Sequence, residues 1–257
     1  MAVAPLLTEE ELDALRQFDT CMVANAVETF NVRLRNTGFS DASIRSMFYE
    51  GSCNEGSCND PSSKVTFSAA PPIGAVPPMV GYAVTARLRS GEPPMRGGTF
   101  HDRADFWNYI LQCPAPRVLV LQDMDNPPGR GAFVGDMHAA ILKALGCIGY
   151  LTNGAVREVS SVRTMGFRLF AGSVAVSHAY AHIFDFGAKI TVGGLEVHPG
   201  ELLHGDANGV LSIPLQIASR IPAVAAELRA AEQKVIDFCQ SSAFSVAKLG
   251  EIMKKIL

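Results

Sequence analysis

The sequence predicts an α/β fold in which a mixed β-sheet carries helices, and three observations lead to this prediction. Strand-like and helix-like segments alternate through the middle of the 257-residue chain, short strands and tight turns follow, and both ends are helical in pattern. Alternating strands and helices build parallel pairs, whereas strands joined by tight turns build antiparallel pairs. We therefore expect one domain over residues 1–257, a layered sandwich with a mixed sheet and helical N- and C-terminal segments.

The composition predicts a globular protein that neither spans a membrane nor binds nucleic acid. Hydrophobic residues make up 48% of the chain, which is enough apolar material for one large core. No apolar run is long enough to cross a bilayer, and the first residues lack the basic start of a signal peptide. The net charge of −3 and the lack of a basic cluster argue against a nucleic-acid partner. We expect a cytoplasmic protein whose scattered cysteines are reduced.

The N-terminal part predicts two helices. Thr8 and Glu11 form the Thr-x-x-Glu pattern of a capping box, in which each side chain satisfies a backbone N–H at the start of a helix. A second helical pattern covers residues 21–30. These helices precede the sheet.

The segment 44–78 breaks the periodic pattern. It is rich in Gly, Ser, Pro and Asn and holds few regularly spaced apolar residues, which is typical of a long loop. Cys53 and Cys58 resemble half of a zinc site, but no second pair of Cys or His follows nearby. We predict an insertion or flap here rather than a metal site.

Regular patterns return at residue 79. Strand patterns cover 79–89, 117–123, 132–135, 147–152 and 167–172, and helix patterns cover 104–113, 136–145 and 156–165. Gly146 and Gly166 stand just past a helix, where glycine is favoured. Asn153-Gly154 is a typical turn pair and separates a strand from the next helix.

In the last third of the chain the pattern changes to short strands joined by tight turns, followed by helices. We expect a short helical piece over 178–188, then strands over 189–194 and 195–197 and a hairpin over 202–214. Residues 215–257 predict C-terminal helices.

The first candidate for chemistry is the start of the helix at Asp136. A helix N-terminus has unpaired backbone N–H groups and partial positive charge, so it attracts anions. Gly135 before it lets a ligand approach the backbone, and the amides of Met137 and His138 then offer donors to a carboxylate or keto oxygen. Taken alone, Asp136 is equally well explained as a helix cap.

The second candidate is the pair Arg157 and Glu158, which follows the next strand. A guanidinium binds a carboxylate or enolate with a planar fork, and a neighbouring acid is a ligand for Mg²⁺ or Mn²⁺. A solvated surface ion pair is the simpler explanation for two such residues. The joint spacing favours a site, because Asp136 is followed by twenty residues and then by this pair.

These motifs resemble the RraA-like proteins, a family that includes class II 4-hydroxy-4-methyl-2-oxoglutarate/4-carboxy-4-hydroxy-2-oxoadipate aldolases and regulators of ribonuclease E activity. The aldolase branch carries Asp, twenty residues and then Arg-Asp, and Asp136, Arg157 and Glu158 stand at those places. The likeness continues through GCIGYLTNGAVRE, FRLFAGS and TVGGLEVHPGELLHGDANGVLSIP, over about residues 80–214, and leaves 44–78 outside. It implies a swivelling β/β/α-type sandwich and a homo-oligomer, either a trimer or a pair of trimers.

The resemblance also implies a role for each residue. The amides after Asp136, those of Met137 and His138, hold the pyruvoyl part of the substrate together with Arg157. Arg157 also stabilises the pyruvate enolate. Glu158 coordinates a divalent cation, Mg²⁺ or Mn²⁺, directly or through water, and Asp136 orients a water that carries protons.

Retro-aldol cleavage and β-decarboxylation both leave an enolate, and a cation with an arginine supplies the electron sink. We therefore expect a metal-dependent lyase that cleaves a small 2-oxo (di)carboxylic acid, releases pyruvate and also decarboxylates oxaloacetate. Two alternatives stay open. One is a non-catalytic regulator that binds a protein such as a ribonuclease, and the other is a lyase or hydro-lyase that acts on another hydroxy acid.

Three departures from the family pattern bear on the substrate and on the activity itself. Glu158 stands where the family has Asp, Asn153-Gly154 where Asp-Gly is usual, and Asn25 where the N-terminal helix usually presents Asp-Ala. A carboxylate that is one methylene longer moves its ligand atoms, and a misplacement of about 1 Å can lower a rate about 100-fold.

Other residues offer weaker hypotheses. Lys189 is the one lysine whose neighbours indicate desolvation, as a Schiff-base mechanism would need. His178 and His182 are four residues apart, which on a helix would place both on one face and suit a transition metal, although an ordinary helix surface explains them as well.

Two acidic residues complete the candidates. Relatives present a glutamate from the C-terminal helix to a neighbouring subunit's metal, and Glu232 stands in such a helix, where most charges are merely solvated. Asp206 is best explained as a turn residue.

Overall fold

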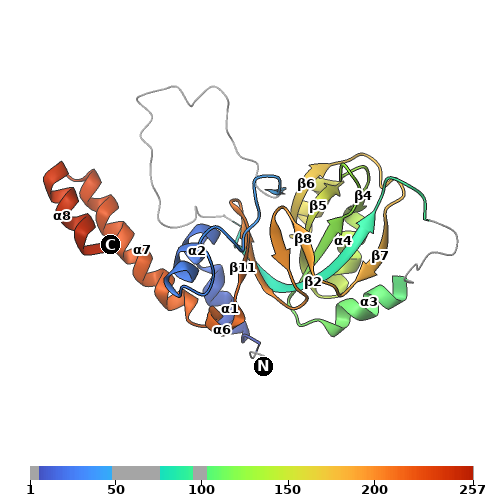
Figure 1. Ribbon diagram of the computed structural model, residues 1–257, viewed down its shortest axis with the longest axis horizontal. Helices are drawn as coiled ribbons and strands as arrows, with labels where there is room; N and C mark the ends of the chain where they lie inside the picture. Colours follow the sequence, from blue (N-terminus) through green and yellow to red (C-terminus); the bar gives the residue numbers. More distant parts are fainter. Residues whose placement is uncertain (1–5, 48–75, 95–102, 257) are drawn as a thin grey trace.

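The computed structural model of the protein describes residues 6–47, 76–94 and 103–256 (Figure 1). Its helices are α1 (Glu9–Arg16), α2 (Thr20–Thr29), α3 (Arg103–Gln112), α4 (Asp136–Ala144), α5 (Val159–Thr164), α6 (Leu215–Ala218), α7 (Ile221–Gln240) and α8 (Val246–Ile256). Its strands are β1 (Arg45–Ser46), β2 (Met79–Arg89), β3 (Arg117–Asp123), β4 (Ala132–Val134), β5 (Cys147–Val156), β6 (Arg168–Val174), β7 (His182–Phe186), β8 (Ile190–Val192), β9 (Leu195–Val197), β10 (Leu202–Asp206) and β11 (Gly209–Ile213). The capping box of α1 is present as predicted.

A nine-stranded sheet organises the described part of the chain. Its order is β1-β6-β5-β3-β2-β10-β11, with β4 beside β5 and β7 beside β2. Strands β2, β3, β5 and β6 are parallel, and β4 is parallel to β5. Strands β1, β7, β10 and β11 pair antiparallel to their neighbours. The mixed sheet predicted from the sequence is confirmed.

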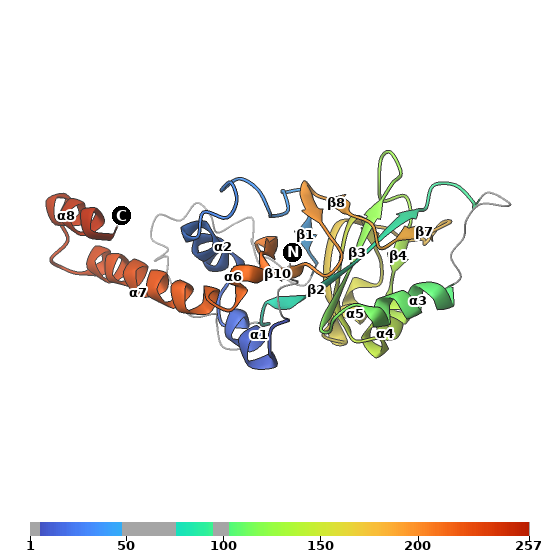
Figure 2. The same ribbon diagram turned by 60° about the horizontal axis from the view of Figure 1, so that its bottom comes forward.

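Both faces of the sheet are covered. On one face, the helices α3, α4 and α5 lie together, and their apolar residues share a core with alternate residues of the central strands (Figure 2). On the other face, the β8–β9 hairpin buries four apolar side chains against the strand residues that alternate with those of the first core. These side chains are Ile190, Val192, Leu195 and Val197. Successive side chains of a strand point to opposite faces, and both faces are covered here, so the central strands are apolar on both sides.

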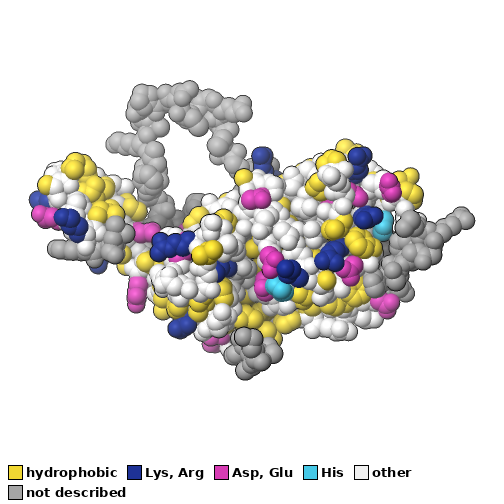
Figure 3. Space-filling view, in the orientation of Figure 1, with side chains coloured by type: hydrophobic (Ala, Val, Ile, Leu, Met, Phe, Trp, Pro, Cys, Tyr) yellow, Lys and Arg dark blue, Asp and Glu magenta, His cyan; other side chains and the backbone are white. Residues whose placement is uncertain are grey.

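The helical ends of the chain pack together at one side of the sheet. Residues of α1, α2, α6 and α7 form a third core with β10, β11 and the start of β2. From there α7 and α8 project away from the body of the protein (Figures 1 and 2). Hydrophobic side chains gather on this projecting end, and acidic and basic side chains are interspersed over the face drawn in Figure 3. No helix in the described ranges is long and apolar enough to cross a membrane.

The predicted helical piece over 178–188 is wrong. The second half of β2 has β3 on one side, and β7 pairs antiparallel with its other side. There Phe186 stacks on Tyr109 with 4.8 Å between ring centroids. This open strand edge offers backbone partners and core contact that a short helix would lack. His178 therefore lies in the loop before β7 and His182 at its start, so they share no helix face.

The predicted turn at Asn153-Gly154 is also wrong, because both residues lie within β5. The Asn153 amide replaces strand partners: its Oδ1 accepts from the Asp123 N–H at 2.7 Å, and its Nδ2 donates to the Asp123 carbonyl at 2.9 Å. The register between β5 and β6 shifts at this point. The pair thus forms an irregularity inside a strand.

Two other boundaries differ from the prediction. The helix predicted over 156–165 begins at Val159, so Arg157 and Glu158 precede it and do not lie in its first turn. The loop predicted over 44–78 starts with the short strand β1, which pairs with β6. Residues 48–75 of that segment, with Cys53 and Cys58, lie outside the described residues.

Candidate active site

The two sequence motifs meet because β4 and β5 are parallel neighbours. Val134 of β4 pairs with Val156 of β5, so both strands end at the same edge of the sheet. The chain leaves β4 through Gly135 into α4, and it leaves β5 through Arg157. The Arg157 N–H donates to the Val134 carbonyl at 3.0 Å, which holds the two exits side by side.

The start of α4 faces carboxylates. Gly135 is its N-cap in extended conformation and offers no side-chain cap, so the first amides need other acceptors. The Asp136 N–H donates to Oε2 of Glu158 at 3.0 Å, and the Met137 N–H donates to Oδ1 of Asp136 at 2.6 Å. The Met137 N–H is thus occupied by the side chain of the preceding residue, Asp136. The backbone N–H that binds a carboxylate from another segment is that of Asp136 itself.

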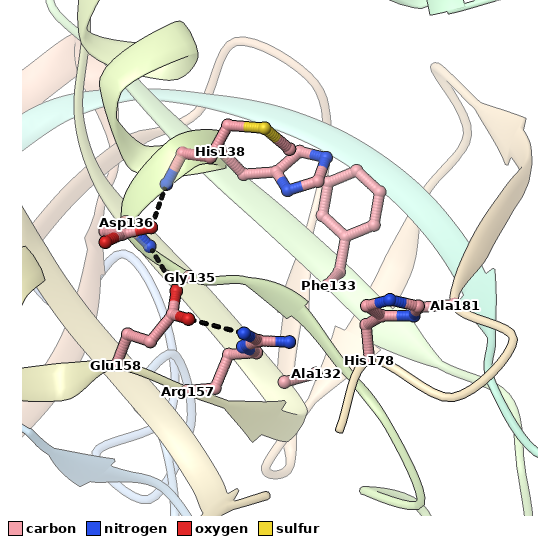
Figure 4. Close-up of a pocket in the computed structure, with 10 residues that line it drawn as sticks. Ala132, Phe133, Gly135, Asp136, His138, Arg157, Glu158, His178 and Ala181 are labelled. Atoms are coloured by element: carbon pink, nitrogen blue, oxygen red, sulfur yellow. Dashed lines mark hydrogen bonds and ion pairs between the residues drawn. The ribbon is translucent and has the colours of Figure 1, made fainter. Parts of the chain in front are cut away.

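Glu158 is held at both of its carboxylate oxygens. Nη2 of Arg157 donates to Oε1 of Glu158, and Oε2 accepts from Asp136 as described (Figure 4). The bond from Arg157, followed by the bond from the Asp136 amide, lowers the pKa of Glu158. The backbone of Glu158 is left-handed, with φ of 54°, a conformation that few residues other than Gly, Asn and Asp adopt.

These residues line a pocket of about 340 Å³. Its walls are Ala132, Phe133, Gly135, Asp136, Met137, His138, Arg157, Glu158, His178 and Ala181. Figure 4 shows Arg157 and Glu158 on one side, with His138 and Phe133 on another. The rings of Phe133 and His138 lie 4.8 Å apart. The pocket thus combines one guanidinium, two carboxylates and an aromatic wall, which suits a small polar acid.

All six residues predicted for the site, Gly135, Asp136, Met137, His138, Arg157 and Glu158, line this one pocket. Sequence reasoning missed Phe133 and placed His178 in a different role. The loop that carries His178 reaches the pocket because the Ala132 N–H donates to the Ser177 carbonyl at 3.0 Å. An ideal Cβ on Gly131 would lie 2.4 Å from the His178 carbonyl oxygen, so glycine permits this approach. Neither contact has a local sequence signal.

The donor set fits a hard divalent cation. The described residues contain no group of three or more His, Cys, Asp and Glu side chains gathered as a metal site. However, Mg²⁺ keeps several waters and is bound by one or two carboxylates, and Asp136 and Glu158 supply two in one pocket. An ionised carboxylate is a preferred ligand of Mg²⁺, so Glu158 can bind a cation from within this pocket.

The other candidates lie elsewhere. Lys189 is about half exposed and pairs with Glu196 at 2.8 Å, so it lacks the desolvation that a Schiff base needs. On the helical side of the molecule, Oε1 of Glu232 lies 3.5 Å from Nδ2 of Asn25. Asp206 makes the predicted turn contact to the Asn208 N–H at 2.8 Å, and it also accepts from the Thr20 N–H at the start of α2.

Comparison with known proteins identifies relatives. The model of the RraA-like family, described as Aldolase/RraA, matches residues 58–212. The match begins inside the segment 44–78, which we expected to lie outside the family. A protein named putative 4-hydroxy-4-methyl-2-oxoglutarate aldolase from Halalkalibacterium halodurans is 32% identical over 84 residues, which is 32% of this chain and 40% of the relative. The chain thus matches less than half the length of that relative.

Solved structures support the fold. An uncharacterized protein from Pseudomonas syringae aligns over 99% of this chain and 98% of its own, with a TM-score of 0.66 and 18% identity. RraAS2 of Streptomyces coelicolor, described as an unusual member of the RNase ES inhibitor RraA protein family, aligns over 89% of this chain and 96% of its own, with a TM-score of 0.61 and 16% identity. At these identities the likeness concerns the fold alone. Because the family model covers more than half of the chain, the protein belongs to the RraA-like family.

Proposed function

We propose that the protein is a divalent-cation-dependent carbon–carbon lyase. It cleaves a small 2-oxo dicarboxylic acid by a retro-aldol reaction and releases pyruvate, and it also decarboxylates oxaloacetate. The observation that carries the proposal is the meeting of the α4 N-terminus, Arg157 and two carboxylates in one pocket. The name of the Halalkalibacterium relative, putative 4-hydroxy-4-methyl-2-oxoglutarate aldolase, agrees with this chemistry.

Each residue has a task in the reaction. Arg157 binds the carboxylate of the pyruvoyl group and stabilises negative charge on the enolate oxygen, because a guanidinium donates two parallel hydrogen bonds. The α4 N-terminus adds amide donors and partial positive charge. When bound by Glu158, with Asp136 in the same pocket, a divalent cation supplies Lewis acidity at the 2-oxo group.

The cleavage has two carbonyl products. The C4 hydroxyl loses its proton and C4 becomes the carbonyl carbon of one product, while the bond between C3 and C4 breaks and its electron pair becomes the enolate of pyruvate. The enolate then takes a proton at C3. Asp136 orients the water that carries these protons, because its carboxylate lies at the helix start beside Arg157 and Glu158. In oxaloacetate, carbon dioxide leaves from C4 and the same enolate forms.

We also propose that the working protein is a homo-oligomer. Val174, the last residue of β6, and Val176, just after it, are 60% and 97% exposed, and Val174 pairs with Val156, which precedes Arg157. The resemblance to the RraA-like proteins implies a trimer or a pair of trimers, and a contact with another copy would bury these two side chains. Light scattering coupled to size-exclusion chromatography is expected to give three or six times the mass of the chain.

A regulator that only binds a protein partner is the competing function. Such a protein has no need of a guanidinium, a helix N-terminus and two carboxylates around one small pocket. A lyase acting on a different hydroxy acid would use the same groups. The proposed lyase and a lyase for another hydroxy acid are distinguished by which substrate yields pyruvate.

The test is a pyruvate-release assay. Purified protein is given 4-hydroxy-4-methyl-2-oxoglutarate or oxaloacetate with Mg²⁺ or Mn²⁺, and pyruvate is followed through lactate dehydrogenase. Controls without protein and with Arg157→Ala protein account for spontaneous decarboxylation. We expect release that EDTA abolishes and added cation restores. No release above these controls from either substrate, with a folded protein, would contradict the proposal.

A further inference from the structure

We infer that Glu158 is an internal competitor of the substrate carboxylate, and that cation binding relieves this competition. The inference rests on the proposed function only in that the pocket is taken to bind a 2-oxo acid. Its consequence is that cation and anion bind cooperatively, because Glu158 is a ligand of the cation and competes with the anion for the same hydrogen-bond donors.

The first step concerns what the subsite recognises. A helix N-terminal amide and a guanidinium that converge on one point form a receptor for a carboxylate, since both donate hydrogen bonds and both carry positive charge. In this protein those groups are the Asp136 N–H and Nη2 of Arg157. Both donate to the carboxylate of Glu158, one to each oxygen. The receptor is therefore filled by the chain itself.

The second step concerns how Glu158 reaches this position. Its left-handed backbone, with φ of 54° and ψ of 36°, turns the side chain back over the start of α4. Gly135 leaves room, since a Cβ there would lie 2.3 Å from Oε2 of Glu158. An aspartate at 158 is shorter by one methylene, about 1.5 Å, so from the same backbone position its carboxylate would not reach both donors. The contact therefore depends on glutamate at this position.

The third step concerns the cost to a ligand. A carboxylate that uses the Asp136 amide and Arg157 must first displace Glu158, and its apparent affinity falls by the fraction of molecules in which the receptor is open. A cation that draws the Glu158 carboxylate away opens the receptor. By linkage, the anion then raises the affinity for the cation by the same factor.

The experiment measures binding without turnover. Oxamate, an isosteric analogue of pyruvate, is titrated calorimetrically into metal-free full-length protein, and then again in the presence of Mg²⁺. The variants are Glu158→Ala, which removes the rival, and Glu158→Asp, which shortens it. Glu196→Gln is the matched control, because it removes a carboxylate from an ion pair with Lys189 outside the pocket.

Without metal, we expect Glu158→Ala to bind oxamate about tenfold more tightly than wild type, as follows if the receptor is open in about one molecule in ten. Glu158→Asp should also bind more tightly, and Glu196→Gln should match wild type. With Mg²⁺, wild type should gain affinity and Glu158→Ala should not.

Equal affinities of wild type, Glu158→Ala and Glu158→Asp in the absence of metal would overturn the inference, as would failure of the folded Glu158→Ala protein to bind oxamate. An equal gain from Mg²⁺ in wild type and Glu158→Ala would also overturn it. Should Glu158→Ala not fold, Glu158→Asp gives the same comparison. None of these readings depends on pyruvate release. Equal oxamate affinities would overturn the inference and leave the proposed function standing, whereas absence of pyruvate release would leave the binding comparison intact.

Discussion

The carboxylate of Glu158 lies in the space that a side chain on Gly135 would occupy. An ideal Cβ on Gly135 would be 2.3 Å from Oε2 of Glu158 and 3.1 Å from Cγ of Arg157. The N-cap of α4 and the pair after β5 are therefore fitted to each other, although 21 residues separate Gly135 from Arg157 in the sequence. The absence of a side chain at one residue makes the arrangement of the other two possible.

Gly135→Ala is expected to lower pyruvate release about 100-fold, because the added methyl group displaces the Arg157 side chain by about an ångström and fills the space in which the substrate carboxylate meets the Asp136 N–H. The backbone of Gly135 is extended, with φ of −127°, so alanine brings no backbone strain. The measurement is steady-state kinetics with oxaloacetate and Mg²⁺. Gly250→Ala is the control, since a Cβ at Gly250 meets nothing within 4 Å. Equal rates for both variants would show that the space at Gly135 is not part of the site.

Arg157→Ala is expected to reduce kcat/KM about 100- to 1000-fold, the usual effect of removing a donor that stabilises an oxyanion. Stability should change little, because an ion pair whose side chains water still reaches contributes little to it. Arg157→Lys should recover part of the activity, since lysine keeps the charge and loses the planar fork. Arg35→Ala, at a residue whose side chain is 76% exposed, serves as control. Wild-type kinetics in Arg157→Ala would remove this residue from the site.

Asp136→Asn is expected to lower kcat about 100-fold and leave oxamate affinity nearly unchanged, because proton transfer is lost while the backbone donors remain. The asparagine oxygen can still accept from the Met137 N–H, so α4 should begin at the same residue. Kinetics and calorimetry on the same preparation separate the two effects. Asp105→Asn removes the acid from the first turn of α3 and is the control. A change in affinity without a change in kcat would assign Asp136 to binding.

His204 should make stability depend on pH. It is fully buried in β10, with Nδ1 3.0 Å from Thr20 Oγ1 and Nε2 3.3 Å from the Leu15 carbonyl oxygen. Burial lowers the pKa of His204, although Asp206 opposes this shift. The unfolded chain, with a histidine pKa of about 6.5, therefore binds a proton more readily than the folded one. Stability is full above that pH and falls as the pH drops below it.

Urea unfolding at several pH values measures this effect. The free energy of unfolding of wild type should fall by up to about 1.4 kcal/mol per pH unit below about pH 6.5. His204→Asn should flatten the slope at the cost of lower stability at pH 7.5. His198→Asn, whose side chain is about half exposed, should leave the slope as it is. A wild-type slope in His204→Asn would assign the pH dependence to other groups.

Much of the fold could be predicted from sequence, because its signals are local. Thr8 and Glu11 cap each other across one turn of helix, and Gly146 adopts positive φ where the helix α4 ends. The central strands are apolar runs bounded by turns. These features depend on near neighbours in the chain.

The errors lie where distant segments decide. Within the piece over 178–188, His182–Phe186 form a strand because β2 has an open edge, and the spacing of two histidines carries no information on that edge. Asn153-Gly154 remained in β5 because Asp123, 30 residues earlier, offered its backbone to the Asn153 amide. The sequence pair Asn-Gly looks the same whether it forms a turn or lies inside a strand.

The candidate site divides in the same way. That Asp136 and Arg157 share a pocket was predicted from their spacing, and it holds because the neighbouring parallel strands β4 and β5 end at one edge of the sheet. That Glu158 fills the carboxylate receptor did not follow, because it depends on a left-handed backbone and on a missing Cβ at Gly135. Neither can be read from the letters alone.

The most direct test of the account is a crystal structure of the protein with Mg²⁺ and oxamate. We predict that the oxamate carboxylate binds Arg157 and the Asp136 N–H, and that Glu158 has left these donors for the cation. Oxamate bound away from this pocket, or Glu158 still on the Asp136 N–H with oxamate and Mg²⁺ bound elsewhere, would contradict the account.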